Sequence, residues 1–238
     1  MKILAIECSA TPCSAAVIEN GKILASDFVN VGLTHSQILM PMAEKVVKEA
    51  NLSFSDIEGF AVSAGPGSFT GIRIGISAVK GLAAPSKKPC VSVSTLYSMA
   101  VNYLDTDCIV CAVMDARCNQ VYNSVFDIEN GEINRICEDR ALLCEELAEN
   151  LKEILQNSKK RVIIVGDGTK VFYPFVENFE KVSLPSEERR FQNAVSVAIA
   201  AEQEFNKGNT LSPEEILPVY LRLPQAEREL KLKKESLK

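Results

Sequence analysis

A chain of 238 residues with 47% hydrophobic and 24% charged residues has the composition of a globular protein with one large or two small domains. Its net charge of -5 argues against binding nucleic acid through a global positive field, because phosphate contacts need a basic face. No apolar run approaches the ~20 residues of a membrane span, and the short N-terminal run, broken by Glu7, does not resemble a signal peptide. We therefore expect a cytoplasmic protein.

The cysteines are scattered through the chain, and most lie inside apolar runs, as is typical of buried free thiols in a reducing compartment. Cys108 and Cys111 have the C-x-x-C spacing of some metal and redox sites. In an extended strand, however, residues three apart point to opposite faces, and no second pair follows at zinc-site spacing. The sequence therefore predicts two buried core cysteines.

The first part of the chain predicts a three-stranded meander followed by alternating helices and strands. Apolar runs on both sides of Asn20-Gly21 indicate a hairpin. The expected strand segments are 2–9, 13–29 with the hairpin turn inside it, 57–65 and 89–94. The expected helices are 34–51, 70–84 and 94–104.

The second part begins with the same order of elements. A strand is expected at 108–117, a hairpin across Asn130-Gly131, a helix at 143–157 and a buried strand at 161–169, and a further helix at 193–208. This order predicts an α/β fold of two duplicated domains, with mixed sheets flanked by helices. The expected boundaries are 1–104 for the first domain, 105–223 for the second, and 224–238 for a charged tail.

Two duplicated halves that each open with a meander resemble the superfamily of actin, Hsp70 and sugar kinases (ASKHA, ribonuclease H-like), in which a nucleotide lies between the domains. Within it, "AGPGSFTGIRIG", "KILAIECSATPCSAAVI", "THSQILMPM", "MDARCNQVY" and "PVYLR" resemble the bacterial TsaB (YeaZ) family. The resemblance covers residues 1 to about 223. It departs from the family at "DARCNQVY", where Arg-Arg or Arg-Lys and Gly-Glu more often precede Val-Tyr.

The resemblance implies two actin-like domains and a non-catalytic scaffold. It implies that the chain binds and activates the transferase TsaD, with the ATPase TsaE joining the complex, in adding the threonylcarbamoyl group to adenosine 37 of tRNAs that read ANN codons. It also implies that tRNA is contacted only through the complex. No cofactor is then required by this chain, and ATP and magnesium are expected on the partner subunits.

The glycine-rich stretch "GPGSFTG" has two interpretations. Backbone amides ahead of a helix, together with the hydroxyls of Ser68 and Thr70, favour an anion. No lysine follows in the Walker arrangement, and a glycine-rich turn into a helix is more often a packing device. If the stretch does bind phosphate weakly, Glu7, Ser68, Thr70 and Asp115 are the candidate contacts.

The helix after this turn carries small residues on one face, at spacings of four, three and four. Such a face needs a close neighbour, which is either the helix at 34–51 or another protein. A partner interface, which a second copy of the chain could also use, is therefore expected. Its residues are Ile38, Leu39, Met42, Val46, Gly71, Gly75, Ala78 and Leu82. Replacing Gly75 by arginine should then abolish association and leave the fold intact.

Two catalytic alternatives remain open. A kinase or ATPase would use Glu7, the glycine loop and Asp115 or Asp167, although Glu7 stands where an aspartate is usual, and carboxylates that end strands are more often turn caps. A peptidase would use His35, the only histidine, but the chain has no G-x-S-x-G motif. One histidine does not supply a two-histidine metal site either, and at a helix start it is more typical of a capping or interface role.

The segment "LPVYLRLP" near the C-terminus offers Tyr220 and Arg222 between two prolines. Its alternating apolar and polar residues fit either an edge strand or an extended segment laid on a domain. The basic end that follows could touch tRNA phosphate, although such ends are more often simply solvated.

Overall fold

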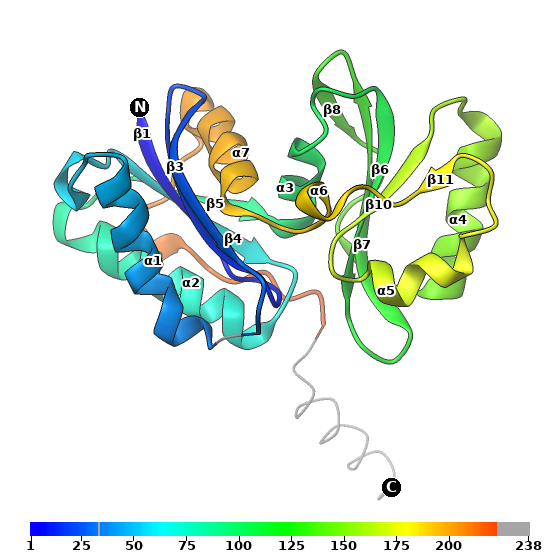
Figure 1. The fold of residues 1–238 in the computed structure, drawn as a ribbon, viewed down its shortest axis with the longest axis horizontal. Helices are drawn as coiled ribbons and strands as arrows, with labels where there is room; N and C mark the ends of the chain where they lie inside the picture. Colours follow the sequence, from blue (N-terminus) through cyan, green and yellow to red (C-terminus); the bar gives the residue numbers. More distant parts are fainter. Residues whose placement is uncertain (33, 223–238) are drawn as a thin grey trace, which may run out of the picture.

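Two sheets, each covered by helices, form two lobes that lie side by side (Figure 1). This is a computed structural model that describes residues 1–32 and 34–222 of the chain. The first lobe is built on a sheet of order β3-β2-β1-β4-β5. Its strands are β1 (Lys2–Glu7), β2 (Cys13–Glu19), β3 (Lys22–Val29), β4 (Gly59–Gly65) and β5 (Cys90–Ser94).

The second lobe repeats this strand order. Its sheet has the order β11-β10-β6-β7-β8, and β9 also pairs with β7. The strands are β6 (Cys108–Asp115), β7 (Gln120–Glu129), β8 (Glu132–Arg135), β9 (Arg140–Leu143), β10 (Val162–Val165) and β11 (Val182–Ser183). In each lobe the central strand, β1 or β6, pairs antiparallel with a strand of the hairpin that follows it and parallel with a later strand, β4 or β10. The predicted α/β class and internal duplication are therefore confirmed.

Both predicted hairpin turns are present. Asn20 and Gly21 have φ values of 49° and 75°, and Asn130 and Gly131 have φ values of 53° and 77°. Positive φ at both central residues is the signature of a type I′ turn, which matches the twist of the flanking strands. The Asn-Gly pairs therefore specify the hairpin near the start of each half of the fold without help from distant residues.

Helices cover both faces of each sheet. The α-helices are α1 (His35–Glu49), α2 (Phe69–Ala83), α3 (Thr95–Val101), α4 (Cys144–Asn157), α5 (Thr169–Phe172), α6 (Glu187–Arg190) and α7 (Ala194–Lys207). The 3-10 turns are η1 (Phe54–Asp56), η2 (Ala84–Ser86), η3 (Tyr173–Phe175) and η4 (Pro213–Glu215). In Figure 1, α1 and α2 lie on the outer side of the first sheet and α4 on the outer side of the second, with α3, α6 and α7 between the lobes.

The chain returns to the first lobe near its end, which differs from the predicted extent of the second domain, 105–223. Helix α7 packs on the inner face of the first sheet, where Ala198 shares a core with Ile3 and Val91. The backbone N–H of Gly21 also donates to Glu202 on α7. The inner face of the first sheet is apolar and must be buried by another element. The order of elements along the chain does not show which of the two sheets a helix near the C-terminus packs on. The predicted tail, 224–238, lies outside the described residues.

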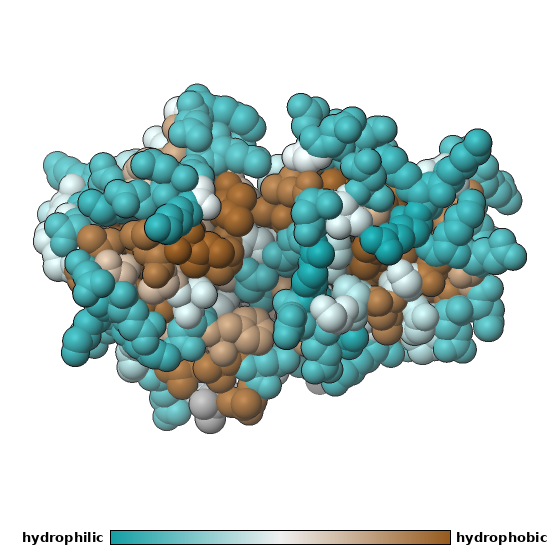
Figure 2. All heavy atoms as spheres, turned by 45° about the horizontal axis from the view of Figure 1, so that its top comes forward, coloured by the Kyte–Doolittle hydropathy of each residue, from teal (hydrophilic) through white to brown (hydrophobic). Residues whose placement is uncertain are grey.

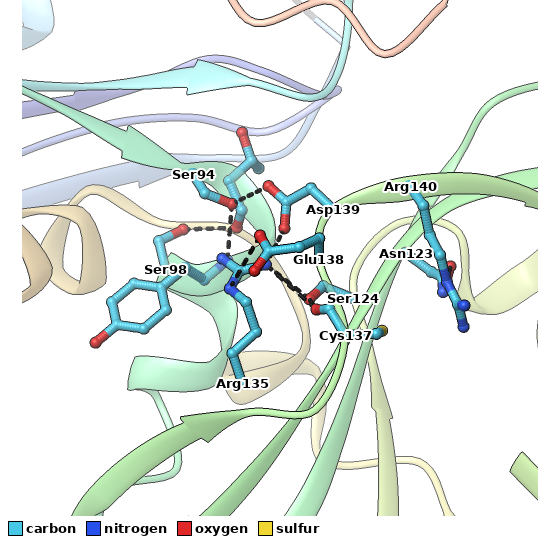
Figure 3. Close-up of polar contacts among 11 residues, drawn as sticks. Ser94, Ser98, Asn123, Ser124, Arg135, Cys137, Glu138, Asp139 and Arg140 are labelled. Atoms are coloured by element: carbon cyan, nitrogen blue, oxygen red, sulfur yellow. Dashed lines mark hydrogen bonds and ion pairs between the residues drawn. The ribbon is translucent and has the colours of Figure 1, made fainter.

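A polar cluster joins the two lobes at the start of α3 (Figure 3). The Nη1 atom of Arg135 donates to Asp139 at 2.5 Å and to Ser124 at 2.9 Å, and its guanidinium lies over the ring of Phe126. Ser94, which caps α3 at the end of the first sheet, donates to the other oxygen of Asp139 at 2.5 Å. These charge-assisted bonds fix the turn between β8 and β9 against the first lobe.

The two cysteines of the C-x-x-C pair lie on opposite faces of β6, as predicted. Cys108 is buried in the core beneath α3, and Cys111 is buried in the core beneath α4. Burial raises the pKa of the Cys108 thiol to about 11, which disfavours the thiolate that metals and redox partners need. Among the residues that the structure describes, no helix is long and apolar enough to cross a membrane.

Candidate functional site

A cavity of about 670 Å³ opens between the lobes at the carboxyl ends of β1, β4, β6 and β10. The first lobe contributes the turn after β1 and the glycine turn before α2. The second lobe contributes the turn after β6 and Asp167 after β10, and the segment 219–222 closes one side. Concave sites of this size between domains are typical places for ligands.

Glu7 lies behind the wall of this cavity and is not among the residues that line it. The side chain is fully buried, and its carboxylate accepts hydrogen bonds from the backbone N–H of Ser9, at 2.6 Å, and from the hydroxyl of Ser63. Burial raises the pKa of Glu7, and the hydrogen bonds from Ser63 and Ser9 oppose that shift. Because both carboxylate oxygens are engaged by the protein, Glu7 is a structural acid in this arrangement, although the sequence analysis grouped it with candidate phosphate contacts.

The other three candidate phosphate contacts do line the cavity. The hydroxyl of Ser68 caps α2 by accepting from the backbone N–H of Gly71 at 3.2 Å. Asp115 accepts from the backbone N–H of Arg117 at 2.7 Å, and Thr70 is exposed. Ser68 therefore caps a helix and Asp115 stabilises a turn, which are the structural roles that the sequence also allowed. The binding of phosphate by these residues stays a prediction.

The turn at Asp115 has an unusual backbone conformation. Arg117, Cys118 and Asn119 all have φ between 54° and 64°, which is the left-handed region that L-residues with side chains seldom adopt. Cys118 and Asn119 are also among the residues of "DARCNQVY" that depart from the family pattern. The turn nevertheless closes β6 onto β7, because Ala116 N–H donates to the carbonyl of Gln120 at 3.0 Å.

Asp167 is the cavity residue with a strongly shifted pKa. It sits in the glycine turn after β10 and accepts a 2.8 Å hydrogen bond from the side-chain amide of Gln192. Desolvation raises the pKa of Asp167 to about 6, with smaller contributions from the negative charges of Asp115 and Glu7, while the Gln192 bond opposes the shift.

Replacing Asp167 by asparagine is expected to stabilise the protein at neutral pH. The folded-state pKa is raised, so ionising this group above its unfolded pKa costs folding free energy. A rise from 3.8 to about 6 corresponds to at most about 3 kcal/mol at pH 7, and this gain should shrink as the pH falls towards 4. Urea denaturation of both proteins at pH 7 and pH 5 measures the difference. A gain that is the same at both values would contradict this account.

His35 and the two cavity aspartates do not form a metal centre. Among residues 1–32 and 34–222, no group of three or more His, Cys, Asp or Glu side chains lies close enough together to hold a metal ion. The imidazole of His35 lies 3.2 Å from the carbonyl oxygen of Thr11, at the start of α1 and beside Gly71 of α2. His35 therefore connects the turn after β1 with the start of α1 and with α2.

Most of the predicted interface residues face the protein's own core. Leu39, Met42 and Val46 are buried beneath α1, and Ile38, Ala78 and Leu82 are half-buried against the same core. These side chains therefore hold α1 and α2 on the first sheet, and their main contacts are internal.

The glycine face of α2 is turned towards the sheet. A Cβ atom at Gly75 would lie 2.8 Å from the Sγ atom of Cys8 and 3.2 Å from Val62, and a Cβ atom at Gly71 would overlap the carbonyl oxygen of Cys8. The small residues thus allow the helix to approach the end of β1. Arginine at Gly75 would disrupt the fold as well as any interface, so it does not test association.

The exposed side of these helices carries a compact aromatic and cationic group. Phe69 and Tyr220 stack with centroids 5.0 Å apart, and Arg73 lies 3.9 Å above the Phe69 ring while its Nε donates to the Tyr220 hydroxyl at 2.7 Å. Met40 on α1 is 40% exposed. We call Met40, Phe69, Arg73 and Tyr220 the α1–α2 face.

Of the two structures predicted for the segment around Tyr220, an edge strand or an extended segment laid on a domain, the structure shows the extended segment. Val219 N–H donates to the carbonyl of Ala64 at 2.7 Å, at the end of β4 and just before the first-lobe glycine turn, but the described part of the segment forms no strand. The Nη1 atom of Arg222 donates to the carbonyl of Ala116 in the second lobe at 2.7 Å. This short segment therefore supports the α1–α2 face and closes the cavity at the same time.

The most exposed large apolar side chains gather on the first lobe and on the segment packed against it. Figure 2 shows brown apolar residues on both lobes between teal polar regions, including a group on the first lobe. In the described part of the chain, only Ile136 and Leu143 of this set belong to the second lobe. The first-lobe members are Ile23, Phe28, Val31, Met40, Phe69, Leu217, Val219 and Tyr220. A one-sided distribution of this kind is typical of a protein-binding surface.

Comparisons with known proteins agree in sequence and in fold. The family model "TsaD: tRNA N6-adenosine threonylcarbamoyltransferase" matches residues 30–230. The tRNA threonylcarbamoyladenosine biosynthesis protein TsaB of Escherichia coli is 32% identical over 93% of this chain and 95% of its own length. The TsaB protein of Bacillus subtilis is 28% identical over 75% of this chain and 76% of its own.

Solved structures give the same result. The chain superposes on YeaZ from Pseudomonas aeruginosa with a TM-score of 0.78 and 28% sequence identity, covering 92% of this chain and 99% of that one. The relatives match nearly the whole chain, and the family model spans both lobes. The protein therefore belongs to the TsaB (YeaZ) family and is a subunit of tRNA threonylcarbamoyladenosine biosynthesis.

Proposed function

We propose that this chain is a non-catalytic subunit that docks a TsaD-family transferase through the α1–α2 face and activates it. The observation that carries the proposal is that most exposed large apolar side chains of the described residues belong to the first lobe and its packed segment, and they include the stacked pair Phe69 and Tyr220. Aromatic and arginine side chains dominate the binding energy of protein interfaces. A partner that covers this face would bury them.

The carboxylates in and behind the cavity between the lobes support the same proposal, because they make hydrogen bonds within the protein. A nucleotide-dependent enzyme of this fold class would use carboxylates to hold magnesium at the phosphates. Here Glu7 is buried and bonded internally, Asp115 closes a turn, and Asp167 accepts a hydrogen bond from the side-chain amide of Gln192. The residues present therefore fit a magnesium nucleotide poorly, and no step of a reaction is assigned to this chain.

Within the proposal, the transferase holds the reacting groups and contacts the tRNA, and ATP and magnesium are bound by partner subunits. A TsaE-type ATPase is the expected third component, and the location is cytoplasmic. Self-association through the same face is a competing state, because one patch serves both a second copy and a transferase. The kinase and peptidase alternatives have no observation in their favour.

Two calorimetric titrations of the isolated chain test this proposal. Adding the cognate TsaD-family transferase should give 1:1 binding, and adding ATP with magnesium should give no turnover by the chain alone. ATP hydrolysis by the isolated chain that is lost in an Asp115→Ala variant would support the kinase or ATPase alternative instead. A transferase that does not bind the wild-type chain at all would refute the docking role.

A further inference from the structure

Arg73 is held in a rigid position on the exposed side of α2. Its guanidinium lies 3.9 Å from the centroid of Phe69 and 5.7 Å from that of Tyr220, and its Nε atom is fixed by the Tyr220 hydroxyl. Among the described residues, no acceptor lies within hydrogen-bond distance of Nη1 or Nη2, and no carboxylate forms an ion pair with this side chain. The protein therefore orients the guanidinium of Arg73 and leaves its Nη1 and Nη2 atoms able to donate hydrogen bonds to a ligand.

The stretch of sequence around Arg73 carries only positive charges, although the whole chain has a net charge of -5. No Asp or Glu occurs in residues 59–104, which contain Arg73, Lys80, Lys87 and Lys88. Lys80 follows Arg73 by two helical turns, on the same side of α2. The start of α2 adds the positive end of the helix dipole. A carboxylate that approaches Arg73 and Lys80 therefore meets no like charge from α2 itself.

A protein carboxylate fits this arrangement better than the phosphates of an RNA. Nucleic-acid surfaces are recognised by several free cations at once. Here the ammonium of Lys80 donates to the carbonyl of Glu214 at 3.0 Å, and that of Lys88 donates to the carbonyl of Ser55 at 2.6 Å. Arg73 remains as one free guanidinium among exposed apolar and aromatic side chains, which is the composition of a protein hot spot.

A second copy of the chain is the alternative occupant of this surface. A two-fold contact places the same patch on both sides of the interface, with residue i of one copy against residue j of the other. Helix α2 has no Asp or Glu, so a second copy could offer Arg73 a carboxylate only from another element. A transferase with an acidic surface supplies that carboxylate directly.

We propose that Arg73 is the anchor of the α1–α2 face and that it binds an Asp or Glu carboxylate of the transferase through a two-bond fork. This inference rests on the proposed function and adds the chemistry of the partner's surface to it. The planar guanidinium of arginine can donate two parallel hydrogen bonds to a carboxylate and stack on an aromatic ring. The lysine ammonium is a compact point charge and does neither. The contact should therefore depend on the shape of the group as well as on its charge.

Calorimetry with the cognate transferase tests the anchor in three variants. Arg73→Met should weaken binding about 30-fold, as expected for loss of a hot spot. Arg73→Lys, which keeps the charge, should still weaken it about 10-fold because the fork is lost. Lys159→Met removes an exposed cation of the second lobe and should change affinity less than about 2-fold. Wild-type affinity should also fall as salt rises.

The outcomes separate this inference from the proposed function. If the wild-type chain binds the transferase and Arg73→Met binds equally well, the anchor is wrong and the docking role stands. If the wild-type chain does not bind, the docking role itself fails. If Arg73→Met instead removes binding of labelled tRNA to the isolated chain, or dissociates a homodimer in ultracentrifugation, while transferase affinity is unchanged, the ligand is RNA or a second copy and the proposal is overturned.

Discussion

Aspartate at both Met40 and Phe69 is expected to weaken binding of the TsaD-family transferase by at least about 100-fold. Each substitution places a charge where an exposed apolar side chain would become buried, and a buried unpaired charge is costly. Met40 is 40% exposed and Phe69 is 37% exposed, so neither change opens a cavity in the core. Aspartate in the first turn of α2 also suits the helix dipole. Calorimetry or co-purification measures the loss.

Ile136→Asp is the matched control for this pair of substitutions. Ile136 is 45% exposed and belongs to the second lobe, so the same chemical change is made away from the α1–α2 face. Its effect on transferase affinity should stay within about 3-fold, in line with contacts outside a hot spot. Circular dichroism of all the variants would show that they fold. Strong loss with Ile136→Asp and none with the double variant would place the interface on the other lobe.

Gly71→Ala is expected to destabilise the fold by about 3 kcal/mol or more, the upper range for overpacking. The new methyl group would overlap the carbonyl oxygen of Cys8, which is backbone and does not rotate away. Alanine is favoured over glycine inside a helix by about 1 kcal/mol, so the steric conflict has to outweigh that gain. Urea denaturation at pH 7 gives the change in the free energy of unfolding.

Gly81→Ala on the same helix should have the opposite sign. No atom lies within 4 Å of a Cβ built at Gly81, and the residue is exposed. The helix preference for alanine then acts alone, with a gain of up to about 1 kcal/mol. If alanine at Gly71 were as well tolerated as at Gly81, α2 would not approach β1 as closely as described.

The elements of the fold were predictable because their signals are local. The turns at Asn20-Gly21 and Asn130-Gly131 and the apolar runs beside them specify two hairpins without information from elsewhere in the chain. Repetition of the same order then indicates duplication. The packing of α7 on the first sheet was not predictable in this way, because a contact between α7 and β1 spans most of the chain and depends on which sheet face is left open.

The candidate interface was predictable only as a region. Helical spacing shows that Gly71 and Gly75 share a face, but it does not show whether that face meets the sheet or a partner. The approach of α2 to Cys8 decides this, and it depends on three-dimensional packing. Arg73 and Phe69 occupy the other side, where exposure, stacking and Tyr220 from a distant segment create the surface. The polar stripe of α2 that includes Arg73 was the signal available in the sequence.

We propose that this chain contributes a docking face and no reacting group to the biosynthesis of threonylcarbamoyladenosine. Modification of tRNA, measured in a reconstituted reaction with the cognate TsaD-family transferase, the TsaE-type ATPase and their substrates, tests this role directly. We expect Asp115→Ala and Asp167→Asn chains to support modification at the wild-type rate, and the Met40→Asp, Phe69→Asp chain not to support it. Loss of modification with the cavity variants, together with full activity of the face variant, would contradict it.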